Sequence, residues 1–346
     1  MKVLHVVGGL DFGGIEKWLS NIFKYSNEDC ENYVISMSSD KRGIVPYLNI
    51  ARGRIFFTKK NNLLYRVVRL YQVIKEVKPD VLHSHAGYSS GLYALIARLL
   101  NVKVLVVHSH SDRRDVDKNA SYLKRCYIFL MKTLIDWLDV RRISVSKGSG
   151  HSLYKSKFDI LYCGVEVNSA DVEVPELSLL KSDGKMLIFH IGRYTEAKNF
   201  EFILSLLKKF RRLDKYHFVF ISGELDEFRK DCARQNIKNV TFLGQVEDPT
   251  RLMHKYADLF ILPSKWEGLP LSAVEAQLSG VTTILSSKIT DEVDLGSAIY
   301  LDLDLVSWES AIIDSEFKDN DIRDDEVSRF SIEKNVEALG AIYNGS

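Results

Sequence analysis

Residues 257–286 form the segment that most constrains the fold. Leu259–Leu262 is a short apolar run of the length and composition of a buried parallel strand. After the loop Pro263–Leu269 we predict a helix that starts at Pro270, where a missing N–H costs nothing, and stops before Gly280. Thr282–Leu285 has the pattern of a second strand. This order of strand, helix and strand predicts a parallel sheet covered by helices, and so an α/β fold.

Two carboxylates flank the start of this predicted helix. Glu267 lies in the loop before it, and Glu275 lies inside it. A helix start presents free N–H groups and a positive dipole end, which suit a phosphate or a hydroxyl-rich sugar. Glutamate is also a common helix former. The spacing alone therefore leaves a ligand site and an ordinary solvated helix end both open.

The same pattern opens the chain. Val3–Val7 is a predicted strand, residues 8–14 are a glycine-rich turn, and Ile15–Tyr25 is a predicted helix. The glycines match neither G-x-G-x-x-G nor a P-loop, which disfavours nicotinamide binding and ATP hydrolysis. Gly13 and Gly14 would still let the backbone approach a phosphate or sugar closely.

Alternating strands and helices continue along the 346 residues, a length that predicts two domains. We place the domains at 1–165 and 185–328, with an irregular acidic linker at 166–184 broken by Pro175. We expect the acidic segment 314–326 to be a solvated loop and helix, and the final segment 329–346 to form a helix that packs back on the first domain. The further predicted strands are Tyr33–Met37, Arg54–Thr58, Val81–Ser84, Lys103–Val107, Ile143–Ser146, Ile160–Tyr162, Met186–Ile191, His217–Ile221 and Val240–Leu243. The further predicted helices are Asn62–Lys78, Tyr122–Leu138, Phe200–Arg212 and Ile332–Tyr343.

Two histidine pairs follow neighbouring predicted strands. His83 and His85 end the strand 81–84, and His108 and His110 follow the strand 103–107. The carboxyl ends of strands are where open α/β sheets place ligands, so the pairs indicate a cleft. Histidine and aspartate are metal ligands, but the spacing resembles no zinc signature, and we predict no metal and no cofactor. The polar stretch Arg113–Asn119 is expected to be a loop.

Charge is unevenly divided along the chain. Residues 1–165 hold 26 Lys and Arg against 14 Asp and Glu, and residues 166–346 hold 21 against 32. The helix 62–78 is basic and amphipathic, with a predicted core stripe of Leu64, Val67, Val68, Tyr71, Ile74 and Val77. The basic half suits an anionic membrane surface or an anionic substrate, whereas opposite charges could also simply help the halves dock. We expect no nucleic-acid partner.

The remaining composition points to the cytoplasm. The four cysteines, Cys30, Cys126, Cys163 and Cys232, form no C-x-x-C, so we expect reduced thiols. Strand-like sequence from Lys2 leaves no room for a signal peptide, and no apolar run reaches the roughly 18–20 residues that span a bilayer. The expected location is cytoplasmic, with peripheral attachment to the inner face of the plasma membrane as an option.

A second glycine and two cations lie at the junction between the strand 186–191 and the helix 200–212. Gly192 is followed by Arg193, whose planar fork suits phosphate oxygens, and by Lys198, which carries a point charge. This segment and the glutamate segment together predict an anion site in the second domain.

At this point the motifs resemble a known family. Gly13-Gly14-x-Glu16, His108, Gly192-Arg193 with Lys198-Asn199, and Glu267-x7-Glu275 occur in the order found in the retaining glycosyltransferases of family 4. The resemblance covers nearly the whole chain and implies the GT-B architecture, in which two Rossmann-like doubly wound domains face each other across a cleft. The segment Lys288–Val293 and the short length are most similar to bacterial capsule and exopolysaccharide transferases.

The resemblance implies roles for the matching residues. In the second, donor-binding domain, Arg193 and Lys198 would hold the donor diphosphate, Glu275 the ribose and Glu267 the sugar near its reacting carbon. Backbone N–H groups around Leu269, Pro270 and Leu271 would meet sugar and phosphate. In the first, acceptor-binding domain, Gly13 and Gly14 would close over the diphosphate, and Glu16, His85 and His108 would line the acceptor side. The catalytic set is then His108, Glu267, Arg193 and Lys198.

Three segments depart from the family pattern. Gly223–Asp226 stands where many members have Gly-Asp-Gly-Pro, Cys163–Glu166 stands for Asn-Gly-Val-Asp, and a Gly-Gly pair is absent near Asp291 and Glu292. These changes put the contacts to the base, the ribose and the sugar in doubt.

The implied activity is a retaining, metal-independent transfer of a sugar by a hexosyltransferase-type enzyme. The donor would be a nucleotide diphosphate sugar, with a UDP-sugar favoured, and the acceptor a glycan or polyprenyl-linked polysaccharide precursor. Two alternatives stay open from the residues alone: a nucleotide-sugar epimerase or hydrolase on the same fold, and a non-catalytic module that binds sugar nucleotides.

Overall fold

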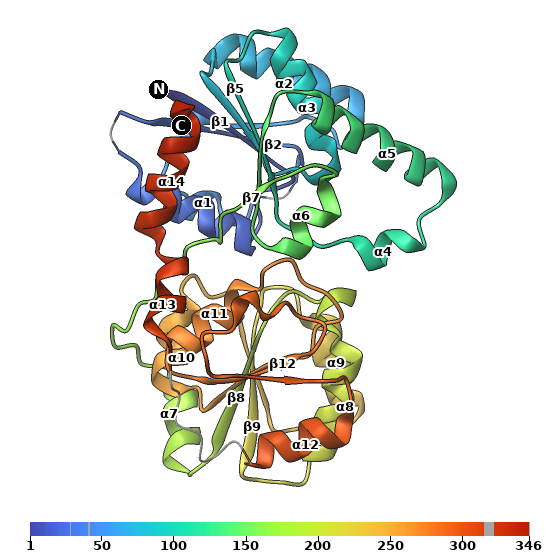
Figure 1. The fold of residues 1–346 in the computed structure, drawn as a ribbon. Coiled ribbons are helices and arrows are strands. Elements are labelled where there is room, and N and C mark those ends of the chain that lie inside the picture. Colours follow the sequence, from blue (N-terminus) through green and yellow to red (C-terminus); the bar gives the residue numbers. More distant parts are fainter. Residues whose placement is uncertain (28, 41, 315–321, 346) are drawn as a thin grey trace. The chain divides into compact units, whose positions relative to one another are not determined.

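The computed structural model describes residues 1–27, 29–40, 42–314 and 322–345. Contacts divide the chain into two units (Figure 1). Unit 1 comprises Met1–Gly164 together with Phe330–Ser346, and unit 2 comprises Val165–Arg329. The chain therefore leaves unit 1 once and returns to it for its last helix.

Unit 1 is built on a seven-stranded parallel sheet in the order β3-β2-β1-β4-β5-β6-β7. The order reverses between β1 and β4, which is the topological switch point of a doubly wound fold. The strands are β1 (Lys2–Val7), β2 (Glu31–Ser36), β3 (Ile55–Phe57), β4 (Val81–Ser84), β5 (Val104–Ser109), β6 (Arg141–Ser144) and β7 (Asp159–Ile160).

The helices of unit 1 lie on both faces of this sheet (Figure 1). Leu4 and Val6 of β1 pack in one hydrophobic core with residues of α2, α3 and α5, so these helices cover one face. His5 contacts Phe23 of α1, and His83 contacts Tyr343 of α14, so α1 and α14 cover the other face. The helices are α1 (Gly14–Tyr25), α2 (Leu63–Val77), α3 (Ser90–Leu99), α4 (Arg114–Lys118), α5 (Tyr122–Trp137), α6 (Lys147–Leu153) and α14 (Ile332–Asn344), with single turns η1 (Val45–Tyr47), η2 (Arg52–Arg54) and η3 (Gly87–Ser89).

Unit 2 repeats the plan with a six-stranded parallel sheet in the order β10-β9-β8-β11-β12-β13. Its switch point lies between β8 and β11. The strands are β8 (Met186–Ile191), β9 (Tyr216–Ile221), β10 (Val240–Gly244), β11 (Leu259–Leu262), β12 (Thr282–Ser286) and β13 (Ala298–Leu301). The helices are α7 (Pro175–Ser182), α8 (Phe200–Phe210), α9 (Asp226–Arg234), α10 (Pro249–Tyr256), α11 (Leu271–Leu278), α12 (Leu305–Asp314) and α13 (Asp324–Val327), with η4 (Glu196–Lys198), η5 (Asp291–Val293) and, at the return to unit 1, η7 (Ser328–Phe330).

The predicted pair of doubly wound domains is confirmed, and most predicted elements lie within two residues of the observed ones. The strands 81–84, 186–191 and 259–262 match β4, β8 and β11. Gly280 follows the end of α11 with a φ of 78°, the left-handed conformation expected just after a helix. The four cysteines are free thiols, as expected.

Three local predictions are wrong. The linker is irregular only over 166–174, because Pro175 starts α7 instead of breaking the chain, in keeping with the tolerance of proline at a first helical position. Pro270 is the N-cap of α11 and not its first residue, since its ψ of 96° is extended. The stretch Arg113–Asn119 is not all loop, because it contains α4.

The predicted core stripe of α2 is also only partly right. Leu70, Val73, Ile74 and Val77 are its buried residues, whereas Leu64, Val68 and Tyr71 are exposed. The predicted and the buried sets of residues both follow spacings of three and four residues. Packing on the sheet decides between them, and it buries the set that continues to the end of the helix. Part of the acidic segment 314–326 lies outside the described residues.

Within the part of the chain that the structure describes, no helix combines the length and apolar composition needed to cross a bilayer.

The amide side chain of Asn335 links helix α14 to two other segments of unit 1. Asn335 Oδ1 accepts a hydrogen bond from Trp18 Nε1 at 2.8 Å and another from the Gly164 N–H at 2.6 Å. Asn335 and Trp18 are buried. One acceptor thus joins α14 to α1 and to the residue at which the chain leaves unit 1.

We predict that Asn335→Ala destabilises the protein by about 2–6 kcal/mol, because two buried donors lose their partner at roughly 1–3 kcal/mol each. Urea unfolding measures the change. Glu337→Ala, an exposed position on the same helix, is the control and should shift stability by no more than about 0.5 kcal/mol. Equal stability of the two variants would contradict the anchoring role of Asn335.

Candidate active site

Two loops of unit 2 carry the predicted donor residues. Gly192–Lys198 follows β8 and Pro263–Leu269 follows β11. Because β8 and β11 are neighbours at the switch point, their carboxyl ends bring the two loops together. The Lys265 N–H donates to the Ala197 carbonyl at 2.7 Å, and Asn199 Nδ2 donates to the Pro263 carbonyl at 3.1 Å.

Lys198 and Glu267 form an ion pair between these loops. Lys198 Nζ lies 2.7 Å from Glu267 Oε1, and the two side chains are only 17% and 14% exposed. Ser264 Oγ donates to the same carboxylate oxygen at 2.7 Å. Both contacts use Oε1, and among the described residues Oε2 of Glu267 stays available to a hydroxyl of a ligand. A shielded pair of this kind holds both charges in place more firmly than an exposed pair does.

Gly192 makes room for the lysine stem. A Cβ at this position would lie 2.8 Å from Lys198 Cε, so a larger residue would displace the side chain. The neighbouring Arg193 is exposed and has no hydrogen-bond or ion-pair partner among the described residues. The loop after β8 therefore offers one cation held by a carboxylate and one free guanidinium.

The start of α11 completes the donor set. Pro270, which follows Leu269, is the N-cap of this helix and offers no side-chain acceptor. The first N–H groups of the helix, from Leu271 onward, are therefore not capped by a side chain. Glu275 lies one turn further and is buried, with 5% exposed. Gln277 donates to the Val293 carbonyl at 2.8 Å and accepts from the Leu295 N–H at 2.9 Å, which ties α11 to the loop after β12.

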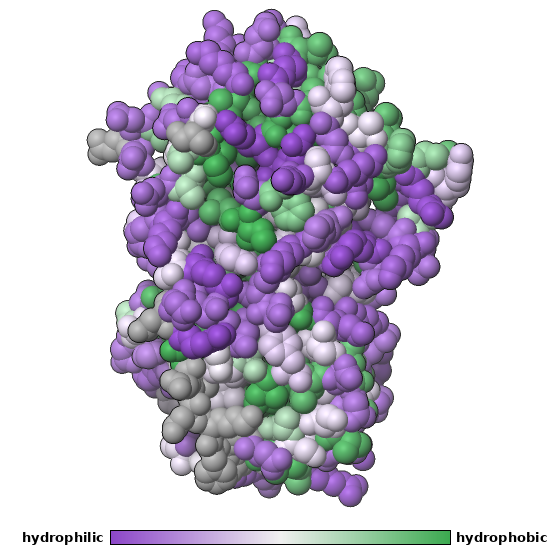
Figure 2. All heavy atoms as spheres, in the orientation of Figure 1, coloured by the Kyte–Doolittle hydropathy of each residue, from purple (hydrophilic) through white to green (hydrophobic). Residues whose placement is uncertain are grey.

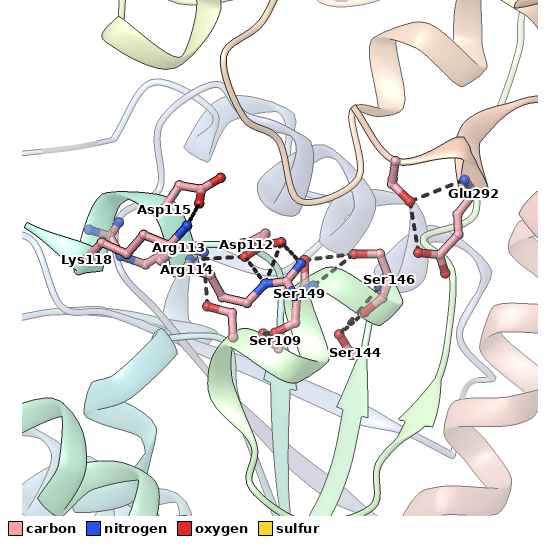
Figure 3. A network of polar contacts seen from close by, with 12 residues as sticks. Ser109, Asp112, Arg113, Arg114, Asp115, Lys118, Ser144, Ser146, Ser149 and Glu292 are labelled. Atoms are coloured by element: carbon pink, nitrogen blue, oxygen red, sulfur yellow. Dashed lines mark hydrogen bonds and ion pairs between the residues drawn. The ribbon is translucent and has the colours of Figure 1, made fainter. Parts of the chain in front are cut away.

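Glu292 lies in that loop after β12. Its carboxylate Oε2 accepts from Thr290 Oγ1 at 3.0 Å, and its N–H donates to the same Thr290 oxygen at 3.3 Å (Figure 3). The side chain is 8% exposed. Thr290 thus caps the turn η5 and fixes the acidic residue.

In unit 1 the predicted residues Gly13, Gly14 and Glu16 lie where β1 meets α1. Gly13 is the N-cap in an extended conformation and provides no side-chain cap, and Gly14 is the exposed first residue of the helix. Glu16 is half-buried in the first turn. The start of α1 thus lacks a side-chain cap and lies at the switch point of the first sheet, a place that suits an anion.

His85 and His108 are buried under α1. His85 is 6% exposed and His108 is 0% exposed. The Trp18 ring covers both of them, with its centroid 5.2 Å from that of His108 and 5.9 Å from that of His85. Their predicted contact with the acceptor stays a prediction, and it would require α1 to move aside.

A polar network surrounds the loop after β5 in unit 1 (Figure 3). Arg114 forms a two-point contact with Asp112, with Nε at 3.0 Å from Oδ1 and Nη2 at 2.6 Å from Oδ2. The Arg114 N–H also donates to Asp112 Oδ1, at 3.1 Å. This aspartate therefore orders the start of α4, which explains why the stretch is not all loop.

Serines support the same edge of the sheet (Figure 3). Ser146 is the N-cap of α6 and accepts from the Ser149 N–H at 3.2 Å. Ser109 Oγ donates to the Ser149 carbonyl at 2.6 Å, and Ser144 Oγ donates to the Ser146 carbonyl at 2.7 Å. These residues position α6 against the ends of β5 and β6.

The structure thus gathers one predicted set in each unit. Arg193, Lys198, Glu267, the start of α11 and Glu275 belong to unit 2, and the glycines, Glu16, His85 and His108 belong to unit 1. Sequence reasoning gave no supporting role to Ser264, and it quoted Asn199 in the motif without a role. A polar residue soon after an apolar strand was a usable signal for Ser264, and asparagine, which tolerates the left-handed φ of 56° seen at Asn199, was one for that position.

Two family models match the chain. Residues 12–169 match the model described as Glycosyltransferase Family 4, and residues 177–290 match the model described as Glycosyl transferases group 1. The first match lies in unit 1 but for its last residues, and the second lies wholly in unit 2.

Curated relatives agree with these matches. The chain is 27% identical to the putative glycosyltransferase EpsF of Bacillus subtilis, over 88% of this chain and 84% of the relative. It is 23% identical to the capsular polysaccharide biosynthesis glycosyltransferase CapH of Staphylococcus aureus, over 99% and 98%. It is 26% identical to an Escherichia coli UDP-Gal:alpha-D-GlcNAc-diphosphoundecaprenol alpha-1,3-galactosyltransferase, over 64% and 61%.

A solved structure shares the fold over its whole length. The Anabaena protein Alr3699/HepE, crystallised in complex with UDP and glucose, superposes with a TM-score of 0.76 and 16% identity, covering 100% of both chains.

One buried histidine under the donor site sets a pH dependence. His190 on β8 is 1% exposed, its Nδ1 contacts the Ile261 carbonyl at 3.0 Å, and its Nε2 has no partner among the described residues. Burial, opposed by the hydrogen bond to the Ile261 carbonyl and aided by the Lys198 charge, lowers the pKa of His190 to about 3. The folded state therefore keeps His190 neutral while the unfolded chain takes up a proton below about pH 6.5.

We predict that the free energy of unfolding falls between pH 7 and pH 5, because the unfolded state gains protons that the folded state does not. In His190→Leu this fall should be smaller by about 2 kcal/mol, since one such proton is removed. Urea unfolding at both pH values measures it. His254→Leu, an exposed position on α10, should keep the native pH dependence. An unchanged slope in His190→Leu would refute the prediction.

Proposed function

Because the chain belongs to glycosyltransferase family 4, we propose that it transfers a sugar from a UDP-sugar to a lipid-linked polysaccharide precursor with retention of configuration and without a metal at the reacting atoms. In coarser terms the chain is a glycosyltransferase of capsule and related polysaccharide synthesis. The donor, the acceptor and the stereochemical course are the proposed parts.

The arrangement of cations in unit 2 is the observation that carries the proposal. Arg193 and Lys198 follow β8, and the uncapped start of α11 follows the neighbouring strand β11. A guanidinium, an ammonium and helix N–H groups are the donors that a diphosphate requires. Lys198 keeps free N–H donors beyond its contact with Glu267, so it can hold that carboxylate and a phosphate oxygen together.

This arrangement would stabilise the departing nucleotide. As the glycosidic bond breaks, negative charge grows on the diphosphate, and fixed cations lower the free energy of that state more than that of the neutral bond. Glu267 would accept a sugar hydroxyl through its unused Oε2, and buried Glu275 would bind the ribose as the family resemblance implies.

Retention would follow from substitution on one face of the sugar. A double displacement requires a carboxylate nucleophile on the opposite face, and Glu267 is already neutralised by Lys198 and hydrogen-bonded by Ser264. We therefore favour a transfer in which the departing phosphate takes the proton of the acceptor hydroxyl. Exclusion of water would prevent hydrolysis of the donor.

The preference for UDP and for a lipid-linked acceptor rests on the relatives. HepE binds UDP and glucose, and the Escherichia coli relative is named for a UDP-Gal donor and a diphosphoundecaprenol acceptor. For the acceptor side of this chain we propose Glu16 and His108 of unit 1, with His85 as a neighbour. Gly13 and Gly14 would instead close over the donor diphosphate.

A lipid-linked acceptor implies a membrane surface, and unit 1 has a suitable face. Helix α5 buries Met131 and Ile135 but exposes large apolar side chains at 55–80%, namely Tyr122, Leu123, Phe129, Leu130 and Trp137. The adjacent α3 exposes Leu99 at 73%. Hydrophobic residues reach the surface among hydrophilic ones along this edge of unit 1 (Figure 2). We call these six residues the α5 face.

Basic residues accompany the α5 face. Lys124 and Arg125 are exposed on α5, and Lys155 Nζ lies 4.1 Å from the centroid of the Phe129 ring. Exposed aromatic and aliphatic side chains beside cations are the composition of surfaces that lie in the headgroup layer of anionic membranes. We propose that the α5 face docks on such a membrane.

We predict that Arg193→Ala, Lys198→Ala and Glu275→Ala each reduce turnover of the preferred nucleotide sugar by about 100-fold or more, because each removes a contact to the charged or ribosyl part of the donor. A panel of UDP- and GDP-sugars with a polyprenyl-diphosphate glycan acceptor measures turnover. Inversion of the product's anomeric configuration would refute retention.

Matched controls are Lys208→Ala and Arg212→Ala, which are exposed cations in or beside α8 and should keep full turnover. Near-normal turnover in all three site variants would overturn the donor assignment. Donor consumption without acceptor would indicate the epimerase or hydrolase alternative, and saturable binding with no turnover would indicate a binding module.

For the membrane we predict sedimentation with phosphatidylglycerol vesicles at low salt, release at high salt, and little binding to phosphatidylcholine vesicles. The combined variant Leu123→Ser, Phe129→Ser and Trp137→Ser should lose most of the binding, since it removes exposed apolar area.

The control is Leu179→Ser with Val306→Ser, which removes exposed apolar side chains from unit 2 and should bind as the native protein does. An absence of vesicle binding at low salt, or full binding by the α5 variant, would contradict docking through the α5 face.

A further inference from the structure

Five histidines form a layer inside unit 1, and we call them the histidine cluster: His5, His83, His85, His108 and His110. In the parallel sheet His5 of β1 is in register with His83 of β4, and His83 is in register with Val106 of β5. Since alternate residues of a strand point to the same face, the other three fall on that face as well. The cluster thus lies between the sheet and helices α1 and α14.

The rings pack against one another where a doubly wound protein usually has aliphatic side chains. The ring centroids are 4.1 Å apart for His83 and His85, and 4.0 Å apart for His108 and His110. Four of the five side chains are at most 6% exposed, and His110 is half-buried. His110 is therefore the member that solvent can reach.

A directed hydrogen-bond chain sets the protonation of three members. Asn32 Oδ1 can only accept, so His5 Nε2 donates to it at 3.3 Å. His5 Nδ1 must then accept from His85 Nε2, at 3.2 Å, which leaves His85 Nδ1 with a lone pair. That lone pair faces His110 Nε2 at 2.9 Å.

His108 stands outside this chain with two unused nitrogens. Its Nδ1 and Nε2 are both buried and have no partner among the described residues. A buried polar atom without a partner costs about 1–3 kcal/mol, so such a ring calls for an explanation. Burial holds the pKa of His108 and of His85 well below the usual range and lowers the pKa of His110 to about 3, so all three rings are neutral and keep a lone pair.

We propose that His85, His108 and His110 bind one divalent transition-metal ion of the zinc type. One nitrogen from each ring lies within 4.8 Å of the others, close enough for small side-chain shifts to bring all three onto an ion. Three neutral imidazoles are a ligand set that Zn²⁺ accepts, with a water molecule in the fourth position. The half-buried His110 provides the route for the ion and the place for that water.

The neighbouring residues support His85 as a ligand. A metal-bound histidine usually donates its second N–H to an acceptor that fixes the ring. With the metal on Nδ1, His85 Nε2–H already donates to His5, which donates to Asn32. The alternative group of His5, His83 and His85 suits an ion less well, because both nitrogens of His5 are engaged in this chain.

Besides the small side-chain shifts, binding would require one proton to change place. His110 would give up its hydrogen bond to His85, and its proton would move from its own Nε2 to its own Nδ1. The lone pair on His110 Nε2 would then bind the ion, and no net proton would be released. Because all three ligands are neutral, the bound ion would keep its full positive charge. We therefore expect that chelators can remove the ion from this site. The ion would join the ends of β4 and β5, outside the donor site of unit 2.

A zinc ion in unit 1 would differ from the sequence prediction, which expected no metal because the histidine spacing resembles no zinc signature. It does not alter the proposed transfer, because a metal on one nitrogen of His108 leaves the other nitrogen for an acceptor hydroxyl.

The test uses the full chain without a histidine tag, stripped with EDTA and titrated with Zn²⁺ and Co²⁺. We expect about one zinc per chain by elemental analysis after gel filtration, a rise in the melting temperature on zinc addition, and visible absorption of the Co²⁺ form typical of a four-coordinate nitrogen site. His108→Ala and His110→Gln should each weaken zinc binding by about tenfold or more and abolish the rise in melting temperature.

His151→Ala and His254→Ala are the controls, because both histidines are exposed and should leave zinc binding unchanged. His110→Gln keeps a polar side chain at the half-buried rim, so it serves if His108→Ala fails to fold, as judged by circular dichroism. Zinc no higher than in a buffer blank, or native affinity in His110→Gln, would overturn the proposal.

Discussion

Parallel pairing of the strands places every loop that follows a strand at one edge of its sheet. In unit 2 this brings the loop after β8 against the loop after β11, and the ion pair of Lys198 with Glu267 joins them. In unit 1 the same pairing stacks the histidine cluster and sets the start of α1 beside it. The candidate donor site and the proposed metal site both depend on strand register, because neither set of residues is contiguous in the sequence.

The two units use this plan for different chemistry. Unit 2 presents fixed cations and a helix start to an anionic donor. Unit 1 combines an open helix start, a buried layer of neutral imidazoles and an exposed apolar and basic helix face. Such a division suits an enzyme that takes one charged water-soluble substrate and one substrate attached to a lipid, which is the division that the proposed function assigns.

Family and fold were predictable, and both are confirmed by the family matches and the two parallel sheets. Short apolar runs between glycine and proline residues located the strands, because a strand buried on both faces must be apolar throughout. Helix faces were harder. In α2 the apolar stripe through Val68 and Tyr71 was as regular as the buried stripe through Leu70 and Ile74, and only packing on the sheet distinguishes them.

The sequence by itself determined the alternation of strands and helices, the family and the residue types at each strand end, since these depend on local periodicity and spacing. Only the tertiary structure decided which of those residues meet. It pairs Lys198 with Glu267, buries His108 beneath Trp18 and adds His5, which no spacing had singled out, to the other histidines. The physical reason is that these contacts cross between strands, where register and helix placement set the distances and local sequence does not.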